Sequence, residues 1–160
     1  MEVNEKLHKV LRLPGNLAEI FRWRFFGLPS SADRAERGRF GEWCARGPLA
    51  RKGLYVLFVN WRNPSDLRDE IDLICKEREV LVFVEVRART AGAPVSGYHS
   101  ISARKKKALL KACRSYLNSR RERPDHFRFD VVEVDLPEDG HSKPKIFHHE
   151  NVALFPSRFH

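Results

Sequence analysis

Charged residues interrupt two strongly apolar segments of this chain. Asp72 lies between Ile71 and Leu73, and Glu85 and Arg87 interrupt a run of valine and phenylalanine. A carboxylate in an apolar strand carries a large desolvation cost unless a cation or hydrogen-bond donors accompany it. Two carboxylates that converge can bind one divalent cation through their oxygens. These positions are therefore candidates for a metal site. The alternatives are a surface-facing pair on a half-exposed sheet and a salt-bridge pair with Arg87 and Arg89.

The spacing of these residues can be tested against a hairpin. Side chains alternate along a strand, so Glu85 and Arg87 share one face. A four-residue turn over Lys76–Glu79 would pair position i with position 155 − i. Asp72 would then face Phe83 and have Glu85 as its diagonal neighbour on the same face, about 7 Å away. A three- or five-residue loop would place Asp72 on the opposite face from Glu85.

Apolar periodicity predicts the elements that would hold these residues. The expected order is a short helix, a longer helix, three strands, a helix and a further strand, which gives an α/β fold with a mixed sheet covered by helices. The predicted helices are Asn16–Gly27, Arg34–Lys52 and Ile101–Leu117, and the predicted strands are Leu54–Trp61, Glu70–Cys75, Val80–Arg89 and Phe127–Val134, with a short strand or turn over Ile146–Phe155.

Residues 1–33 are expected to form an N-terminal extension with a short aromatic and basic helix, residues 34–156 one domain, and residues 157–160 a tail. Phe21, Trp23, Phe25 and Phe26 alternate with arginines in the extension. These aromatic side chains could touch a membrane surface or a partner. We favour the simpler interpretation that the helix packs on its own domain.

The basic residues of the chain are concentrated in one segment. The 160 residues include 30 Lys and Arg against 21 Asp and Glu, a net charge of +9. Residues 100–128 hold ten basic and two acidic residues, and so contribute +8 of that excess. A concentrated positive face favours a polyanionic partner, with nucleic acid the first candidate, although such a face can also be merely solvated. The candidate nucleic-acid contacts are Arg104, Lys105, Lys106, Lys107, Lys111 and Arg114.

Several classes of protein are not indicated. No segment approaches the roughly 20 consecutive apolar residues of a membrane span, and the first ten residues lack the features of a signal peptide. Cys44, Cys75 and Cys113 are far apart and form no metal-binding pair, so three reduced thiols are expected. These features predict a cytoplasmic protein. His148 and His149 lack further ligand residues nearby and are expected at the surface.

The spacing Asp72-x12-Glu85-x-Arg87 resembles the PD-(D/E)xK nuclease signature, whose last position is usually lysine. Its wider context is similar to the YraN-like family of uncharacterised bacterial proteins, which is related to archaeal Holliday junction resolvases. That similarity covers about residues 37–155. It rests on the segments Phe40-Gly41-Glu42, Glu70–Ile74, Phe83–Arg87, Ser100-Ile101 before the lysine-rich helix, and Arg128–Val132.

The resemblance implies a restriction-endonuclease-like fold, with a central mixed β-sheet flanked by helices. It also implies that Glu42, Asp72 and Glu85 bind Mg²⁺ or Mn²⁺, and that Asp72, Glu85 and Arg87 are the catalytic residues. Arg87 would orient and stabilise charge, because arginine, unlike lysine, does not release its proton.

The expected activity is metal-dependent hydrolysis of phosphodiester bonds in branched or structured nucleic acid, DNA more than RNA. A homodimer would suit a two-fold symmetric junction. The alternative is a catalytically inactive nuclease-fold module that binds nucleic acid or a protein partner. A weaker third alternative is an interaction module that acts through the aromatic extension.

Overall fold

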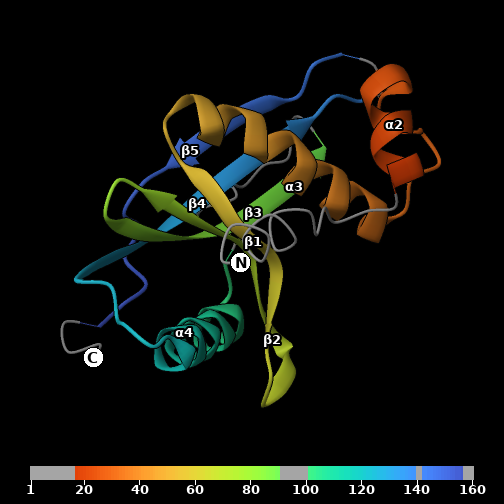
Figure 1. Cartoon of the computed structure of the whole chain (residues 1–160). Coiled ribbons are helices and arrows are strands. Elements are labelled where there is room, and N and C mark those ends of the chain that lie inside the picture. The colour runs from red at the N-terminus through yellow and green to blue at the C-terminus, as the bar shows by residue number, and fades with distance from the viewer. Residues whose placement is uncertain (1–16, 91–100, 140–141, 157–160) are drawn as a thin grey trace.

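A five-stranded mixed sheet forms the centre of the protein, with the strand order β1-β2-β3-β4-β5 (Figure 1). The computed structural model describes residues 17–90, 101–139 and 142–156. The helices are α2 (Leu17–Phe26), α3 (Arg34–Arg51) and α4 (Ala103–Ser119), and the strands are β1 (Tyr55–Asn63), β2 (Asp66–Glu77), β3 (Val80–Thr90), β4 (His126–Leu136) and β5 (Lys145–His149).

The connections between the strands explain their directions. β1, β2 and β3 form an antiparallel meander, because short turns can join only antiparallel neighbours. β4 runs parallel to β3, since α4 lies between these two strands in the chain and permits a crossover. β5 then pairs with β4 in the antiparallel sense. This is a restriction-endonuclease-like α/β fold, and the predicted fold class is confirmed.

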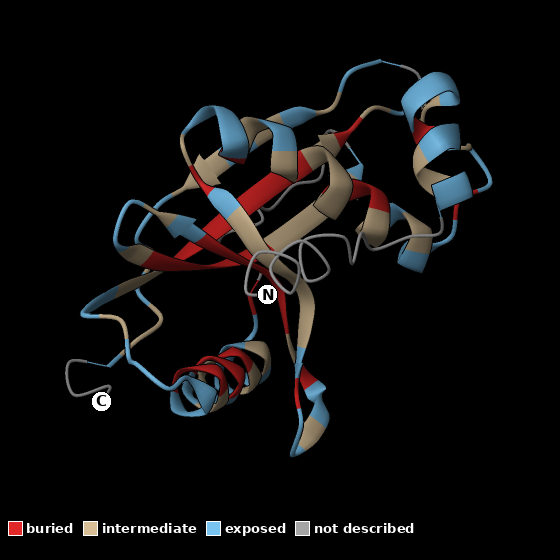
Figure 2. Cartoon of the chain, in the orientation of Figure 1, coloured by how far each residue is buried: buried red, intermediate tan, exposed pale blue. Residues whose placement is uncertain are grey.

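Two apolar clusters lie on the two faces of the sheet. On one face, Ala45 and Leu49 of α3 pack with strand residues such as Val84. On the other face, Leu109 of α4 packs with residues such as Phe83. Figure 2 shows the buried residues concentrated in the strands and along one side of α4, whose other side is exposed. The charged side of α4 is therefore presented to the solvent.

The turn between β2 and β3 differs from the prediction. The strands pair from Glu77 with Val80 to Leu73 with Val84, so position i faces position 157 − i, and only Arg78 and Glu79 form the turn. Arg78 adopts a left-handed conformation with a φ of 51°, as two-residue hairpin turns often require. The predicted register was wrong by two residues. Because two is even, every side chain keeps its predicted face.

Trp23 is the buried residue by which helix α2 packs on the domain, and the partly buried Ile20 packs against the same cluster. Trp23 is 3% exposed and its ring centroid lies 5.6 Å from that of Phe40 in α3. The other aromatic side chains of α2, those of Phe21, Phe25 and Phe26, are exposed. The helix therefore packs on its own domain, as the simpler interpretation expected. The division into an extension, a domain and a tail stays a prediction, and residues 1–16 and 157–160 lie outside the described part of the chain.

The structure also describes the features on which the membrane-span and free-thiol predictions depend. None of them combines the length and the apolar character needed to cross a bilayer. Cys44, Cys75 and Cys113 are all free thiols, and the last two are buried.

Candidate metal and nucleic-acid site

Asp72 and Glu85 lie at the point where β2 and β3 stop pairing. The last paired residues are Leu73 and Val84, and the same register continued by one step places Asp72 directly opposite Glu85. The β1–β2 hairpin then continues as an arm away from β3 (Figure 1). Asp72 Oδ2 accepts a hydrogen bond of 2.7 Å from the Val86 backbone N–H. The two acids are 7% and 1% exposed, so the sheet holds both carboxyls together and largely away from water.

Two cations approach this acid pair from different elements. The Lys105 ammonium lies 3.1 Å from Glu85 Oε2, and Arg87 Nη1 lies 3.5 Å from Glu85 Oε1. Lys105 stands in the first turn of α4 because the Ser102 side chain caps that helix, accepting a hydrogen bond from the Lys105 backbone N–H at 3.2 Å. The sequence identified Lys105 as a candidate nucleic-acid contact of the basic helix, and the structure places its ammonium at Glu85.

Burial shifts the ionisation of this cluster. It raises the pKa of Asp72, and together with the nearby Asp72 it raises the pKa of Glu85 to about 8. Burial also works to lower the pKa of Lys105, but attraction to Glu85 and Asp72 outweighs it and leaves that pKa raised. Lys105 is therefore a charged ammonium, and burial disfavours the charged forms of both acids.

Glu42 approaches the acid pair from helix α3. Its neighbour Gly41 allows this, because a Cβ at that position would lie 2.5 Å from the Cβ of Ala88 in β3. Burial, followed by repulsion from Asp72, raises the pKa of Glu42 to about 7, and a hydrogen bond with the Asn60 side chain lowers it in part. Glu42 Oε2 is buried without a hydrogen-bond partner among the described residues. Glu42 is thus a third desolvated acid in the neighbourhood.

The donor set can be compared with what a divalent cation needs. Within residues 17–90, 101–139 and 142–156, no three His, Cys, Asp or Glu side chains form a ready ligand cluster. Glu42 therefore does not join Asp72 and Glu85 in a three-member set in this conformation. Among the described residues, none is a partner of Glu85 Oε2 with hydrogen-bond geometry, although Lys105 lies at ion-pair distance. Two adjoining carboxyls, both destabilised as anions by burial, are chemically suited to Mg²⁺ or Mn²⁺.

Asn60 was not found from the sequence. It lies within β1 and has a φ of 48°, a left-handed conformation that is rare inside a strand and that asparagine tolerates better than most residues. Its hydrogen bond with Glu42 connects β1 with α3. An apolar strand pattern carries no signal for such a residue.

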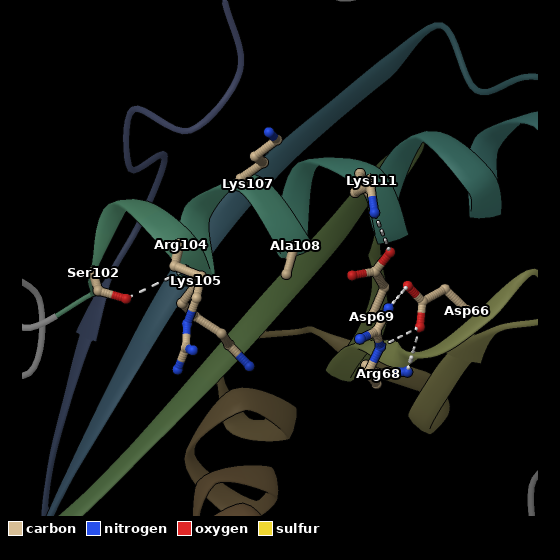
Figure 3. Close-up of a pocket in the computed structure, with 9 residues that line it drawn as sticks. All are labelled: Asp66, Arg68, Asp69, Ser102, Arg104, Lys105, Lys107, Ala108 and Lys111. Carbon is tan, nitrogen blue, oxygen red and sulfur yellow. Dashed lines mark hydrogen bonds and ion pairs between the residues drawn. The ribbon is translucent and has the colours of Figure 1, made fainter.

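A cation-lined cavity of about 460 Å³ adjoins the acid pair, between α4 and the β2 arm. Figure 3 shows its lining residues, with Lys111 of α4 in contact with Asp69 of β2. That contact is 3.4 Å long, and Asp69 is buried. The basic residues that line the cavity are Arg68, Arg104, Lys105, Lys107 and Lys111. Four of the six predicted nucleic-acid contacts thus face one cavity.

The other two predicted contacts lie elsewhere on α4. Lys106 and Arg114 are both exposed, and Arg114 lines a separate hollow of about 100 Å³ towards the end of the helix.

A second charged cluster on β4 has a structural role. Asp130 is fully buried and lies 2.9 Å from His148 Nε2 and 2.9 Å from Arg128 Nε. Burial works to raise the pKa of Asp130, but these partners and the Asn151 backbone N–H outweigh it and leave the pKa lowered. The expected surface position of His148 was wrong, since its side chain is only 5% exposed. Pairing with a buried acid is the physical reason.

The fold and the acid pair together define a chain of the restriction-endonuclease-like class with a paired-carboxylate site. Residues 41–134 match the uncharacterised protein family UPF0102, and the chain belongs to this family. Its resemblance to YraN-like proteins is therefore confirmed.

Several UPF0102 proteins are similar to this chain over most of their lengths. One from Desulfitobacterium hafniense is 35% identical over 118 residues, which cover 72% of this chain and 94% of that protein. One from Anaeromyxobacter dehalogenans is 35% identical over 126 residues, or 79% and 85% of the two chains. One from Pseudomonas paraeruginosa is 37% identical over 122 residues, or 74% and 93%.

Proposed function

We propose that this protein is a metal-dependent endonuclease that hydrolyses phosphodiester bonds in nucleic acid. The observation that carries the proposal is the buried pair Asp72 and Glu85, which adjoins two cations and a basic cavity. Buried acids with raised pKa values beside a cleft are typical of functional sites.

Asp72 and Glu85 are the residues that would hold a divalent ion. Such an ion, when bound, supplies positive charge that lowers the pKa of water and stabilises charge on a phosphate oxygen. The backbone N–H of Val86 fixes the Asp72 carboxylate through a 2.7 Å hydrogen bond. Val86 thereby orients this ligand before any substrate arrives. The charge of Asp72 helps to raise the pKa of Glu42. In its ionised form, Glu42 would strengthen the negative potential of the site.

Lys105 and Arg87 would together occupy the place of the single lysine in the nuclease signature. Arginine cannot act as a base at physiological pH, and the raised pKa of Lys105 keeps this side chain protonated as well. Both cations would therefore stabilise charge on the scissile phosphate and orient Glu85, and neither would accept a proton.

The basic side of α4 would hold the substrate by its backbone. Arg104, Lys107 and Lys111 line the cavity beside the site, and contacts of such side chains with phosphates give affinity without base specificity. DNA with branched or otherwise structured regions is the proposed substrate, and a homodimer would suit a two-fold symmetric junction. A cytoplasmic location would give access to such DNA.

The proposal is tested by incubating the full chain with matched branched and linear DNA in Mg²⁺ or Mn²⁺. Cleavage should require the metal and fall by at least a hundred-fold in Asp72→Asn and in Glu85→Gln, because each change removes a charged ligand. Glu79→Gln is a matched control, since that carboxylate is 89% exposed in the β2–β3 turn. Cleavage that persists in the Asp72→Asn, Glu85→Gln double variant would remove this mechanism.

A second candidate is a nuclease-fold module that binds nucleic acid without cleaving it. It is favoured by one observation, that Lys105, the lysine that lies at ion-pair distance from Glu85, has a raised pKa and stays protonated. Unchanged DNA affinity in EDTA, with neither metal binding nor cleavage, would support this candidate.

A further inference from the structure

A second cation-lined cavity lies between the start of α3 and the end of β3, and it includes Arg87, the partner of Glu85. Its volume is about 540 Å³, and four of the residues that line it are arginines: Arg34, Arg37, Arg87 and Arg89. None of the described residues that line it is acidic.

The positions of these arginines follow from the two elements. Arg34 and Arg37 are one helical turn apart and so lie on the same side of α3. Arg87 and Arg89 share the face of β3 opposite Val86 and Ala88, which pack with the α3 cluster, and they border the hollow at the end of the strand. The close approach at Gly41, where an added Cβ would meet Ala88, brings this end of β3 against α3.

Two of these arginines, Arg34 and Arg37, offer exposed positive charge with which an anion in the hollow would pair. Within the described residues, no ion pair is recorded for the side chains of Arg34 and Arg37, and both residues are exposed. These two guanidinium groups add positive charge to the hollow beside Arg87, which pairs with Glu85. Arginine presents a planar fork of donors that matches phosphate oxygens in two-point contacts.

Glu85 connects this hollow with the α4 cavity. Arg87 lines the arginine-rich cavity and lies 3.5 Å from Glu85. Lys105 lines the α4 cavity and lies 3.1 Å from the same carboxylate. A negatively charged strand that ran from one cavity to the other would therefore pass the acid pair.

We infer that the Arg34–Arg37–Arg87–Arg89 cavity binds backbone phosphates of the nucleic acid on the side of the acid pair away from α4. The inference rests on the proposed function, because it assumes that nucleic acid lies across Asp72 and Glu85. Residues of α3 would thus supply a second anchoring region. One part of the bound strand would contact the α4 cavity, and another part would contact the arginine-rich cavity.

The test compares DNA binding by the wild type and by the Arg34→Ala, Arg37→Ala double variant. Binding is measured by fluorescence anisotropy in EDTA, with duplexes of increasing length and at several salt concentrations. The matched control is the Arg51→Ala, Lys145→Ala double variant, which removes two exposed positive charges at other positions of the fold. Arg87 is left unchanged because it belongs to the proposed catalytic site.

With duplexes long enough to occupy both cavities, the arginine variant should lose roughly ten- to sixty-fold in affinity near 0.1 M salt. Its slope of log affinity against log salt should become shallower by about 1.8, or about 0.9 for each lost phosphate contact. The loss should be much smaller with short duplexes that can occupy the α4 cavity alone, and the control variant should bind as the wild type does.

An arginine variant that binds every duplex as tightly as the wild type, with an unchanged salt slope, would overturn the inference. An equal loss at all lengths would also overturn it, because that result indicates general attraction and no second anchoring region. A loss confined to duplexes with a terminal phosphate would assign the cavity to strand ends, and would likewise contradict binding of internal phosphates. None of these results depends on cleavage, so a length-dependent loss without any cleavage would support the inference while contradicting the proposed hydrolysis.

Discussion

Replacing Glu85 by glutamine should stabilise the metal-free protein at alkaline pH. Glu85 is 1% exposed, and its pKa rises from 4.5 to about 8 in the folded protein. The folded state therefore binds this proton more tightly than the unfolded state does. The stability associated with the protonated acid is fully present below pH 4.5 and is lost as the pH rises towards 8.

The size of this effect follows from the pKa difference. A shift of that extent corresponds to roughly 3–4 kcal/mol lost between pH 5 and pH 8. Movement of Lys105 and Arg87, both about one-third exposed, and partial hydration of the carboxylate reduce the expected value to roughly 1–3 kcal/mol. Glutamine has the shape of a protonated glutamate and does not ionise, so the variant should keep its stability across this range.

The assay is urea unfolding in EDTA at pH 5, 6, 7 and 8. Wild type and Glu85→Gln should have similar free energies of unfolding at pH 5, and the variant should be the more stable protein at pH 8. The exposed Glu79→Gln control should follow the wild type throughout. Parallel curves for wild type and Glu85→Gln would refute the argument that burial of this acid costs stability.

Three further predictions concern other parts of the fold. Gly41→Ala should destabilise the protein by roughly 1–3 kcal/mol in thermal unfolding, because its Cβ would lie 2.5 Å from that of Ala88; an unchanged midpoint would contradict that close approach. Asp130→Asn should cost roughly 1–3 kcal/mol in urea at pH 7, because Arg128 and His148 lose the buried anion that joins them and keep Glu77 and Glu150 as acidic neighbours. Since the folded pKa of Asp130 is lowered from 3.8, its contribution should be present above pH 3.8 and decrease as the pH falls below it, and a difference that stays constant there would argue against this account. Lys107→Ala should make the salt slope of DNA binding shallower by about 0.9, whereas an unchanged slope would remove this residue from the interface.

The shared face of Asp72 and Glu85 could be predicted from the sequence although the predicted strand register was wrong. Side chains alternate between the two faces of a strand, so a register error of two residues leaves each side chain on its predicted face. The predicted register paired Asp72 with Phe83, whereas the observed register continues to Glu85, yet both place the two acids on one face. The exact register depends on the left-handed turn residue Arg78, which no composition rule for turns favours at that position.

Features that depend on tertiary packing could not be predicted from local pattern. Whether Lys105 reaches Glu85 depends on how α4 lies across the sheet, which the periodicity of the helix does not determine. Glu42 was suggested only through the family resemblance, since its approach depends on the contact between Gly41 and Ala88. The arginine-rich cavity combines residues some fifty positions apart, and neither segment is unusual by itself.

The most direct test of the central claim is a calorimetric titration of Mn²⁺ into the purified chain and into its Asp72→Asn and Glu85→Gln variants at pH 8. The account predicts one saturable site in the wild type that is lost or weakened at least ten-fold in each variant and is kept in Glu79→Gln. Equal Mn²⁺ binding by all four proteins, or no binding by any of them, would contradict the assignment of a divalent-cation site to Asp72 and Glu85.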